Sequence, residues 1–391
     1  MRRAPIAALV STVFALASAL PTSASATVTW RNGDLELALQ EATRTGRRVL
    51  VDFWAVWCGP CQTMDGVVWN RDDITQAVNA GWIALRVDAD TPIGTQLRQR
   101  FHIGALPAML ALRADGSEID RHTGDATSTV TLALLRAWSR EQSTLDVLAA
   151  RLQQNPADTE LRLDVGTRYA DRADEVNARM LLERVIADDP RNARGFAARA
   201  LLVLGDRLHL RARRDAAAAI PFLERLVHDY PTTDSGIHGY VPLVTALHRI
   251  QRDTEARAVS ERYLASAAPD AYANRANSLA WMMFREHWDL RRAEQISRAG
   301  LQRTPTNDAL IDTLAEIVFA LGRPSEAAEI EGRALRLNPA STHYRDQVAR
   351  FRAAAGPTPT GGGATSNRRP RRPPRTVRPA AQTRAPSTPG A

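Results

Sequence analysis

Two cysteines are the residues of this 391-residue chain whose type and spacing could do chemistry. Cys58 and Cys61 stand three positions apart in the segment WCGPC, shortly after a strand-like run that ends at Trp54. A helix that begins near Cys58 offers unpaired N–H groups and partial positive charge to its first residues. Both favour a thiolate, which is the nucleophile in disulfide exchange. We therefore predict that Cys58 attacks a disulfide and that Cys61 resolves the mixed disulfide.

Three neighbours of the cysteines belong to the predicted site. Trp57 would shield the sulfurs, Gly59 and Pro60 separate the cysteines, and proline is tolerated in the first turn of a helix. Zinc is the alternative ligand for closely spaced cysteines, but a zinc site needs four ligands and the chain has no second cysteine pair. We expect no metal and no cofactor besides the redox-active disulfide.

Strand-like and helix-like segments alternate around this motif, over residues 27–140. Runs rich in β-branched and aromatic residues predict strands, and apolar residues at helical spacing predict helices. The run from Arg47 to Trp54 is apolar nearly throughout, as in a central strand buried on both faces. This order predicts an α/β layer. The predicted strands cover 47–54, 82–88, 108–112 and 119–122, and the predicted helices cover 34–45, 58–64, 72–80, 94–101 and 129–140.

Residues 141–355 differ in character, because strand-like runs are absent and prolines recur at intervals of 34 to 41 residues. A helix–turn–helix unit of about 34 residues is the tetratricopeptide period, so we predict an all-α array of five repeats, two or three of them atypical. Such arrays bind peptides or proteins in a concave groove. Trp281 and Trp288 could line that groove, although packing between helices is the commoner role. The recurring prolines are Pro156, Pro190, Pro231, Pro269, Pro305 and Pro339.

The two ends of the chain carry an uneven share of its basic residues. Residues 1–26 have two arginines, a short apolar run and the A-x-A site Ala24–Ala26, which predicts a cleaved signal peptide, a mature start at Thr27 and a periplasmic or otherwise exported protein. An uncleaved membrane anchor is the alternative, and no other segment could span a membrane. Residues 356–391 hold seven arginines and no acid, and we expect them to be disordered. Without these ends the charges nearly cancel, so the basic balance does not indicate a basic binding face on the folded part, and we expect an exported protein to have no nucleic-acid partner.

The segment VLVDFWAVWCGPC resembles the thioredoxin family, over roughly residues 28–140. The stretches GRRVLVDF and VVWNRDDITQAV resemble, more narrowly, the C-terminal reductase domain of DsbD-type interchange proteins. The resemblance implies a thioredoxin fold in which Pro107, in GALPAML, follows a cis peptide bond beside the disulfide. It also implies that Asp52 is a buried acid whose pKa is raised by desolvation. The basic residue that often accompanies this acid would fall near Ala84 and is absent, so we expect Asp52 to lack a basic partner.

The combined prediction is an exported thiol–disulfide oxidoreductase that reduces protein disulfides while its repeat array holds a client or partner. The CGPC motif is typical of reducing thioredoxins, and an exported reductant needs a membrane donor or another thiol donor of electrons. One alternative is a disulfide oxidase or isomerase of the same fold. Another is a repeat-based interaction or chaperone scaffold with an accessory thioredoxin domain.

Overall fold

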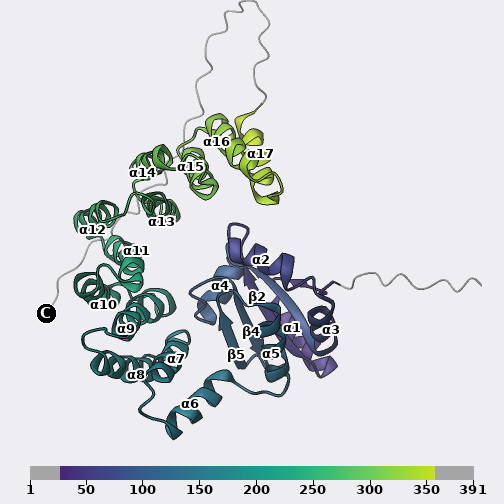
Figure 1. Cartoon of the computed structure of the whole chain (residues 1–391). Helices are drawn as coiled ribbons and strands as arrows, with labels where there is room; N and C mark the ends of the chain where they lie inside the picture. Colours follow the sequence, from purple (N-terminus) through teal and green to yellow (C-terminus); the bar gives the residue numbers. More distant parts are fainter. Residues whose placement is uncertain (1–26, 357–391) are drawn as a thin grey trace, which may run out of the picture.

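The computed structural model describes residues 27–356, so the predicted signal peptide and all of the predicted tail after Gly356 lie outside the described residues. An α/β unit forms the first part of this range, and an array of helices forms the rest (Figure 1). The array curves in an arc, and the α/β unit lies on the inner side of that arc (Figure 1). The chain is therefore an α/β unit followed by an all-α helical array, as predicted.

A five-stranded sheet forms the centre of the α/β unit, with the strand order β1-β3-β2-β4-β5. β3 is parallel to both β1 and β2, whereas β4 is antiparallel to β2 and to β5. β2 lies in the middle, and its five residues from Val49 to Phe53 are all buried, which is why this run carries almost no polar residue. The strands are β1 Arg31–Asn32, β2 Arg48–Trp54, β3 Trp82–Asp88, β4 Ala108–Leu112 and β5 Glu118–Thr123.

Helices cover both faces of the sheet, because alternate residues of β2 point to opposite sides. Val49, Val51 and Phe53 pack with α1 and α4 on one face. Leu50 packs on the other face in a cluster that also contains residues of α2, α3 and α5. Asp52 shares the side of Leu50 and therefore faces the layer that contains α2. The helices are α1 Leu35–Thr45, α2 Gly59–Val67, α3 Asp72–Gly81, α4 Pro92–Arg100 and α5 Ser128–Ser139.

Every strand and helix predicted for this unit is present in the predicted order, with bounds that differ by a few residues. The prediction missed β1, which has two residues and pairs with the edge of β3 through Arg31 and Asn32. A segment this short has no hydrophobic period, so only its partner strand defines it.

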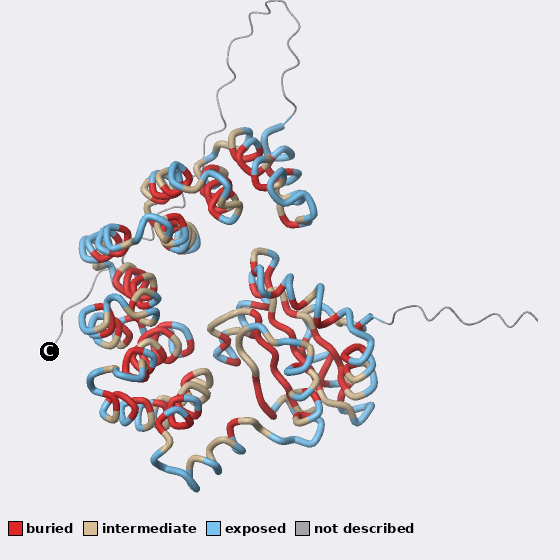
Figure 2. The backbone as a smooth tube through the Cα atoms, viewed as in Figure 1, coloured by how far each residue is buried: buried red, intermediate tan, exposed pale blue. Residues whose placement is uncertain are grey.

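The array consists of consecutive helix pairs, with buried residues where helices face one another and exposed residues on their outer sides (Figure 2). Five of the six recurring prolines lie two residues after the last residue of a helix, where a residue that cannot continue the helix is tolerated. Among residues 27–356, no helix is both long and apolar enough to cross a membrane. The pairs are α7 Thr159–Ala170 with α8 Glu175–Asp188, α9 Phe196–Leu202 and η1 Val203–Ala212 with α10 Ala216–Asp229, α11 Asp234–Arg249 with α12 Asp253–Ala265, α13 Tyr272–Arg285 with α14 Leu290–Arg303, and α15 Asp308–Ala320 with α16 Pro324–Leu337. α6 Thr144–Gln154 precedes the pairs, and α17 Thr342–Ala355 follows them.

The longest proline interval, from Pro190 to Pro231, contains an irregularity that the sequence does not predict. Here α9 continues directly into η1, a π-helix of 10 residues. A π-helix inserts extra backbone into a helical run and is often found at functional sites. Two arginines of η1, Arg207 and Arg211, line a cavity of about 180 Å³ together with residues of the α/β unit. The long repeat thus contributes one of the contacts between the array and the α/β unit.

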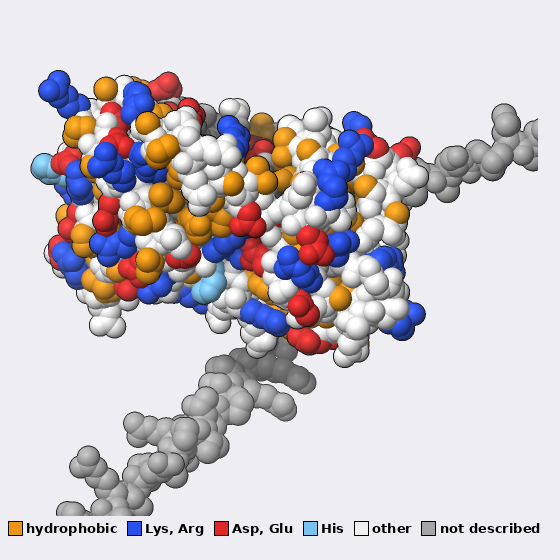
Figure 3. Space-filling view, turned by 90° about the horizontal axis from the view of Figure 1, so that it is seen from below, with side chains coloured by type: hydrophobic (Ala, Val, Ile, Leu, Met, Phe, Trp, Pro, Cys, Tyr) orange, Lys and Arg blue, Asp and Glu red, His pale blue; other side chains and the backbone are white. Residues whose placement is uncertain are grey.

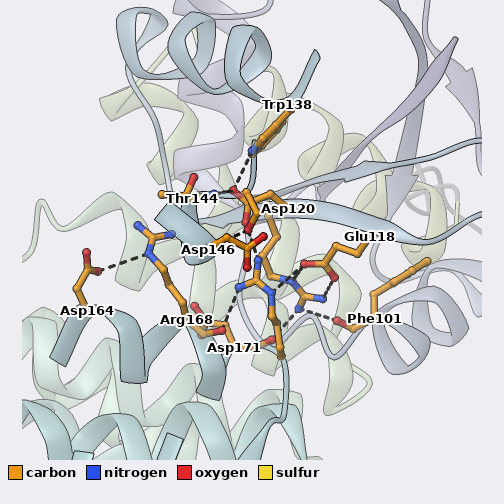
Figure 4. A network of polar contacts seen from close by, with 12 residues as sticks. Phe101, Glu118, Asp120, Trp138, Thr144, Asp146, Asp164, Arg168 and Asp171 are labelled. Atoms are coloured by element: carbon orange, nitrogen blue, oxygen red, sulfur yellow. Dashed lines mark hydrogen bonds and ion pairs between the residues drawn. The ribbon is translucent and has the colours of Figure 1, made fainter. Parts of the chain in front are cut away.

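A group of buried polar side chains joins the α/β unit to the start of the array (Figure 4). Asp120 of β5 is fully buried, accepts hydrogen bonds from Trp138 Nε1 (2.9 Å) and the backbone N–H of Thr144 (2.8 Å), and pairs with Arg172 (2.6 Å). Arg121 donates from Nη1 to the backbone oxygens of Phe101 and Asp171, both at 2.7 Å. We call Asp120, Arg121 and Arg172 the junction network. It links the two parts, because Asp120 and Arg121 of β5 are buried and bind Arg172 and the backbone of Asp171 at the end of α7.

Acidic and basic side chains are interspersed on the face of the molecule shown in Figure 3. Neither sign forms a large continuous patch on that face, and both the α/β unit and the array show this mixture. Opposite charges therefore lie close to one another on this face, in line with their near cancellation over residues 27–355.

Candidate active site

Cys58 and Cys61 form a disulfide at the N-terminus of α2. The chain leaves β2 at Trp54, makes a short turn and enters the helix with Cys58 as its N-cap residue. Cys58 Sγ accepts a hydrogen bond from the backbone N–H of Cys61 at 3.2 Å. Pro60 stands in the first turn, where its missing N–H leaves no helical bond unmade. In the reduced protein, the unpaired backbone N–H groups of the first turn of α2 and the helix dipole would stabilise a Cys58 thiolate.

The disulfide is nearly covered by its surroundings. Cys58 is 4% exposed and Cys61 is 2% exposed, whereas Gly59 and Pro60 between them are exposed. The two sulfurs lie in an apolar cluster with Ala55 and Ala89, against which Trp54, Trp57 and Leu106 also pack. The structure therefore places Trp57 next to the disulfide, and access to the sulfurs depends on the groups of this cluster.

Pro107 follows a cis peptide bond, as the resemblance implies. It is buried at the start of β4, and its carbonyl oxygen accepts a hydrogen bond from the N–H of Gly124 at 2.9 Å. Because Leu106 packs against the cysteine cluster, the loop before Pro107 borders the disulfide. The motif and this loop lie some 45 residues apart along the chain, and the antiparallel pairing of β2 with β4 brings them together.

Asp52 is 2% exposed, and the expectation that it lacks a basic partner is wrong. In the parallel register of β2 and β3, Arg86 is the residue opposite Asp52, and Arg86 Nε lies 3.6 Å from Asp52 Oδ2. The guanidinium of Arg86 also binds both oxygens of Asp65 on α2, at 2.6 and 2.7 Å, and lies over the ring of Trp54. The basic partner of Asp52 was expected near Ala84 and lies two residues further along β3, because only the register of the two strands shows which residue faces Asp52.

The pKa of Asp52 is raised to about 7. Burial is the main cause, the charge of Arg86 opposes it, and Asp65 raises the pKa further. Among the described residues, no hydrogen bond joins Asp52 to either cysteine. Asp52 is therefore a buried carboxyl with a pKa near neutral on the side of the sheet that carries α2.

Replacing Asp52 with asparagine should change how stability depends on pH. The carboxyl binds its proton more tightly in the folded state than in the unfolded state, so its contribution to stability is complete at low pH and is lost as the pH rises from about 4 to about 7. Relative to the wild type, Asp52→Asn should therefore gain roughly 2 kcal/mol between about pH 5 and about pH 8. Urea unfolding of both oxidised proteins across this range measures the difference. Parallel curves for the two proteins would show that Asp52 does not titrate in this window.

One helix of the array reaches the active site. The ring of Trp281 on α13 lies 5.8 Å from the ring of Trp57, centroid to centroid, and Arg285 Cζ lies 4.9 Å above the Trp57 ring. Asp90, in the loop after β3, accepts a hydrogen bond from Trp57 Nε1 and pairs with Arg285 at 2.9 Å. We call Trp57, Asp90, Trp281 and Arg285 the α13 contact. A residue about 220 positions from the cysteines thus forms part of their surroundings.

The two tryptophans singled out in the repeats have different roles. Trp288 is 5% exposed and stacks on His248 at 4.9 Å, so it packs between helices. Trp281 is only partly buried and faces the active site instead. Sequence reasoning missed Asp90, Arg86 and Arg285 as neighbours of the site. Asp90 follows the carboxyl end of a predicted strand, which could have indicated it, but nothing in the local sequence marks Arg285.

Comparisons with known proteins agree with this geometry over the first third of the chain. A family model described as thioredoxin-like matches residues 29–114. The thiol:disulfide interchange protein DsbD of Pseudomonas fluorescens is 31% identical over 110 residues, which are 27% of this chain and 18% of that protein. Thioredoxin 1 of Synechococcus elongatus is 33% identical over 90 residues, which are 23% of this chain and 78% of that protein.

The comparison with solved structures also finds a helical repeat protein that is similar to part of the chain. The crystal structure of a thermophilic tetratricopeptide protein of Thermus thermophilus aligns over 50% of this chain and 98% of the other chain, with 22% identity and a TM-score of 0.34.

The chain spans only 18% of the length of the DsbD proteins that it matches.

Proposed function

This chain belongs to the thioredoxin-like family, and from that premise we propose that it is an exported thiol–disulfide oxidoreductase that reduces disulfides of client proteins. The observation that carries the proposal is the place of Cys58 at the N-terminus of α2, with its sulfur against the N–H of Cys61 and the buried carboxyl of Asp52 on the α2 side of the sheet. A merely structural disulfide would not need a helix N-terminus, a bordering proline loop or a buried acid.

The proposed reaction starts from the dithiol. The Cys58 thiolate attacks one sulfur of a client disulfide, the client S–S bond breaks, and its other sulfur leaves as a thiolate that takes up a proton. Cys61 loses its proton and attacks Cys58 Sγ, so the mixed disulfide breaks and the second client sulfur is released. Two electrons pass from the cysteine pair to the client, and the pair ends as the disulfide seen in the structure. A dithiol protein, in or at the membrane, returns two electrons and two protons.

The array has the second role in this proposal, which is to hold the client. Its inner side faces the α/β unit, and α13 touches Trp57 directly, so a polypeptide bound along the inner side of the arc lies next to the disulfide (Figure 1). Export is supported by the arginines, apolar run and A-x-A site of residues 1–26. No cofactor is needed, because the cysteine pair carries both electrons.

The test of the proposed direction is the reduction potential of the Cys58–Cys61 pair in the mature protein. We expect a value near the thioredoxin end of the known range, about −270 mV, when the pair is equilibrated with a dithiol buffer. A value near −120 mV would make the protein an oxidant of client thiols instead. Equilibrium with several buffer ratios, read by thiol alkylation and mass spectrometry, distinguishes the two results.

A further inference from the structure

Two loops border the disulfide, and each is bound by an arginine from another element. Arg285 of α13 pairs with Asp90 in the loop after β3. Arg211 of η1 donates to the carbonyl oxygen of Gly104 (3.3 Å), in the loop that leads to Pro107. At Gly104 the contact is so close that a Cβ would lie 2.7 Å from Arg211 Cβ, so glycine is required there. The array therefore brings positive charge to both sides of the active site.

Two further arginines, Arg98 and Arg214, lie near Arg211 and Arg285. Neither has an acidic partner within the described residues. Arg98 of α4 makes one hydrogen bond, from Nε to the carbonyl oxygen of Ile103 (3.3 Å), which leaves both of its terminal nitrogens without a protein partner. Arg214, directly after η1, is exposed and makes no hydrogen bond or ion pair with residues 27–356. Burial and the charges of Arg285, Arg214 and Arg211 lower the pKa of Arg98 and Asp90 opposes them, so Arg98 lies close enough to each of the other three arginines to interact with its charge.

We call Arg98, Arg211, Arg214 and Arg285 the arginine rim. Two carboxylates accompany it, since Arg211 pairs with Asp206 (2.7 Å) and Arg285 with Asp90. Arg98 and Arg214 are thus the members of the rim without a carboxylate partner among the described residues and give it an excess of positive charge, although the charges of the chain from 27 to 355 nearly cancel. Guanidinium groups bind carboxylates with paired, charge-assisted hydrogen bonds.

We propose that the arginine rim binds carboxylates of the client, so that the protein selects disulfides flanked by aspartate or glutamate in an extended polypeptide segment. The inference rests on the proposed function, because it places the client at the disulfide. Since Cys58 is only 4% exposed, an approaching client displaces groups packed around it. A client carboxylate can take the place of Asp90 on Arg285 and thereby break the ion pair that joins the loop after β3 to α13, while Arg98 and Arg214 bind further carboxylates.

The experiment measures binding separately from chemistry. Three labelled peptides of the same length carry serine in place of cysteine and glutamate, glutamine or lysine at the flanking positions, and their dissociation constants with the oxidised full-length protein are measured by fluorescence anisotropy. We expect the glutamate peptide to bind at least about tenfold more tightly than the lysine peptide at low salt. The preference should fall sharply at about 1 M salt, where the Debye length is about 3 Å.

Variants assign that preference to the rim. Arg98→Gln and Arg214→Gln should each reduce the ratio between the glutamate and lysine peptides, and the double variant should bring it close to one. Arg44→Gln is the matched control, because Arg44 is exposed at the C-terminal end of α1, at the end of the sheet where β2 begins rather than where the disulfide lies. Arg214 is exposed in a loop, so its variant should fold normally, which thermal unfolding checks.

Equal affinity of the three peptides for the wild type would overturn the inference, as would a preference unchanged in the double variant. The reduced protein is also reacted with the corresponding cysteine peptides, each supplied as a mixed disulfide. The rate of this exchange tests the proposed function independently of binding. Exchange at equal rates with equal binding rejects only the arginine rim as a selector. A preference for glutamate in binding without any exchange supports the rim and rejects the reductase.

Discussion

Replacing Cys58 with serine should abolish disulfide reduction, by roughly 10³-fold or more, as the loss of a nucleophile does in other enzymes. Serine has nearly the same size and can accept the same hydrogen bond from the N–H of Cys61, but its hydroxyl does not ionise near neutral pH. The variant therefore lacks the attacking group, while the helix start is kept. Reduction of a disulfide-bonded protein substrate, followed by alkylation of the new thiols, measures the effect.

Cys61→Ser is the matched control for this prediction. It keeps the attacking thiolate and lacks the resolving one, so it should accumulate a mixed disulfide with the client that is visible on a non-reducing gel. Both variants should be compared with the reduced wild type, because neither can form the Cys58–Cys61 disulfide. Equal unfolding curves of the three reduced proteins would show that the fold is unchanged.

The same pair of variants decides between the enzyme and the scaffold. If the repeats alone carry the function, Cys58→Ser retains both client binding and the cellular phenotype. If the protein is a reductase that uses its array to hold clients, the variant binds clients but loses the phenotype. The α13 contact favours the second outcome, because a scaffold has no need to place Trp281 against the tryptophan beside the cysteines.

Replacing Asp120 with alanine should destabilise the protein by about 3–5 kcal/mol, the usual effect of removing one partner of a buried ion pair. Asp120 is fully buried, and its loss leaves the N–H groups of Trp138 and Thr144 without an acceptor and removes one of the two carboxylates that pair with Arg172. Because these partners come from both the α/β unit and the array, the loss should also weaken the attachment between them. Chemical unfolding followed by tryptophan fluorescence measures the stability, and hydrogen exchange in β5 and α7 measures the attachment.

The control for this prediction is Asp125→Ala, which removes an exposed carboxylate five residues away that makes no side-chain bond to the described residues. It should change stability by less than about 0.5 kcal/mol. A change equally small for Asp120→Ala would show that the junction network does not hold the two parts together. Asp120→Asn keeps one acceptor oxygen and should lie between the two.

The sign of the pH dependence at Asp120 is opposite to that at Asp52. Burial by itself would raise the pKa of Asp120, but hydrogen bonds from Thr144 and Trp138 and the charge of Arg172 lower it below the usual 3.8. Its contribution to stability is therefore complete above about pH 5 and is lost as the pH falls through the folded pKa. Acid should thus loosen the junction, whereas a rise in pH from about 4 to about 7 destabilises the α/β unit at Asp52.

The chemistry of this protein is local in sequence, and that is why it could be predicted. Cys58, Cys61, Trp57 and Pro60 lie within five residues, and the geometry that activates them is that of a helix start, which depends on its own first turn. The order of strands and helices followed from hydrophobic periods, and the repeats followed from the spacing of prolines. Each of these signals lies within a window of a few residues or one repeat.

The tertiary structure alone decided what surrounds the cysteines. Strand register chose Arg86 rather than the position of Ala84 as the partner of Asp52, because opposite residues of two strands depend on both strands at once. The curvature of the array, summed over several helix pairs, brought Trp281 and Arg285 to Trp57 and Asp90. Helix packing angles accumulate over such a distance and leave no mark in any short segment. The sequence by itself therefore determined that the Cys58–Cys61 disulfide is the bond this protein can exchange, and only the fold decided which groups lie around that bond.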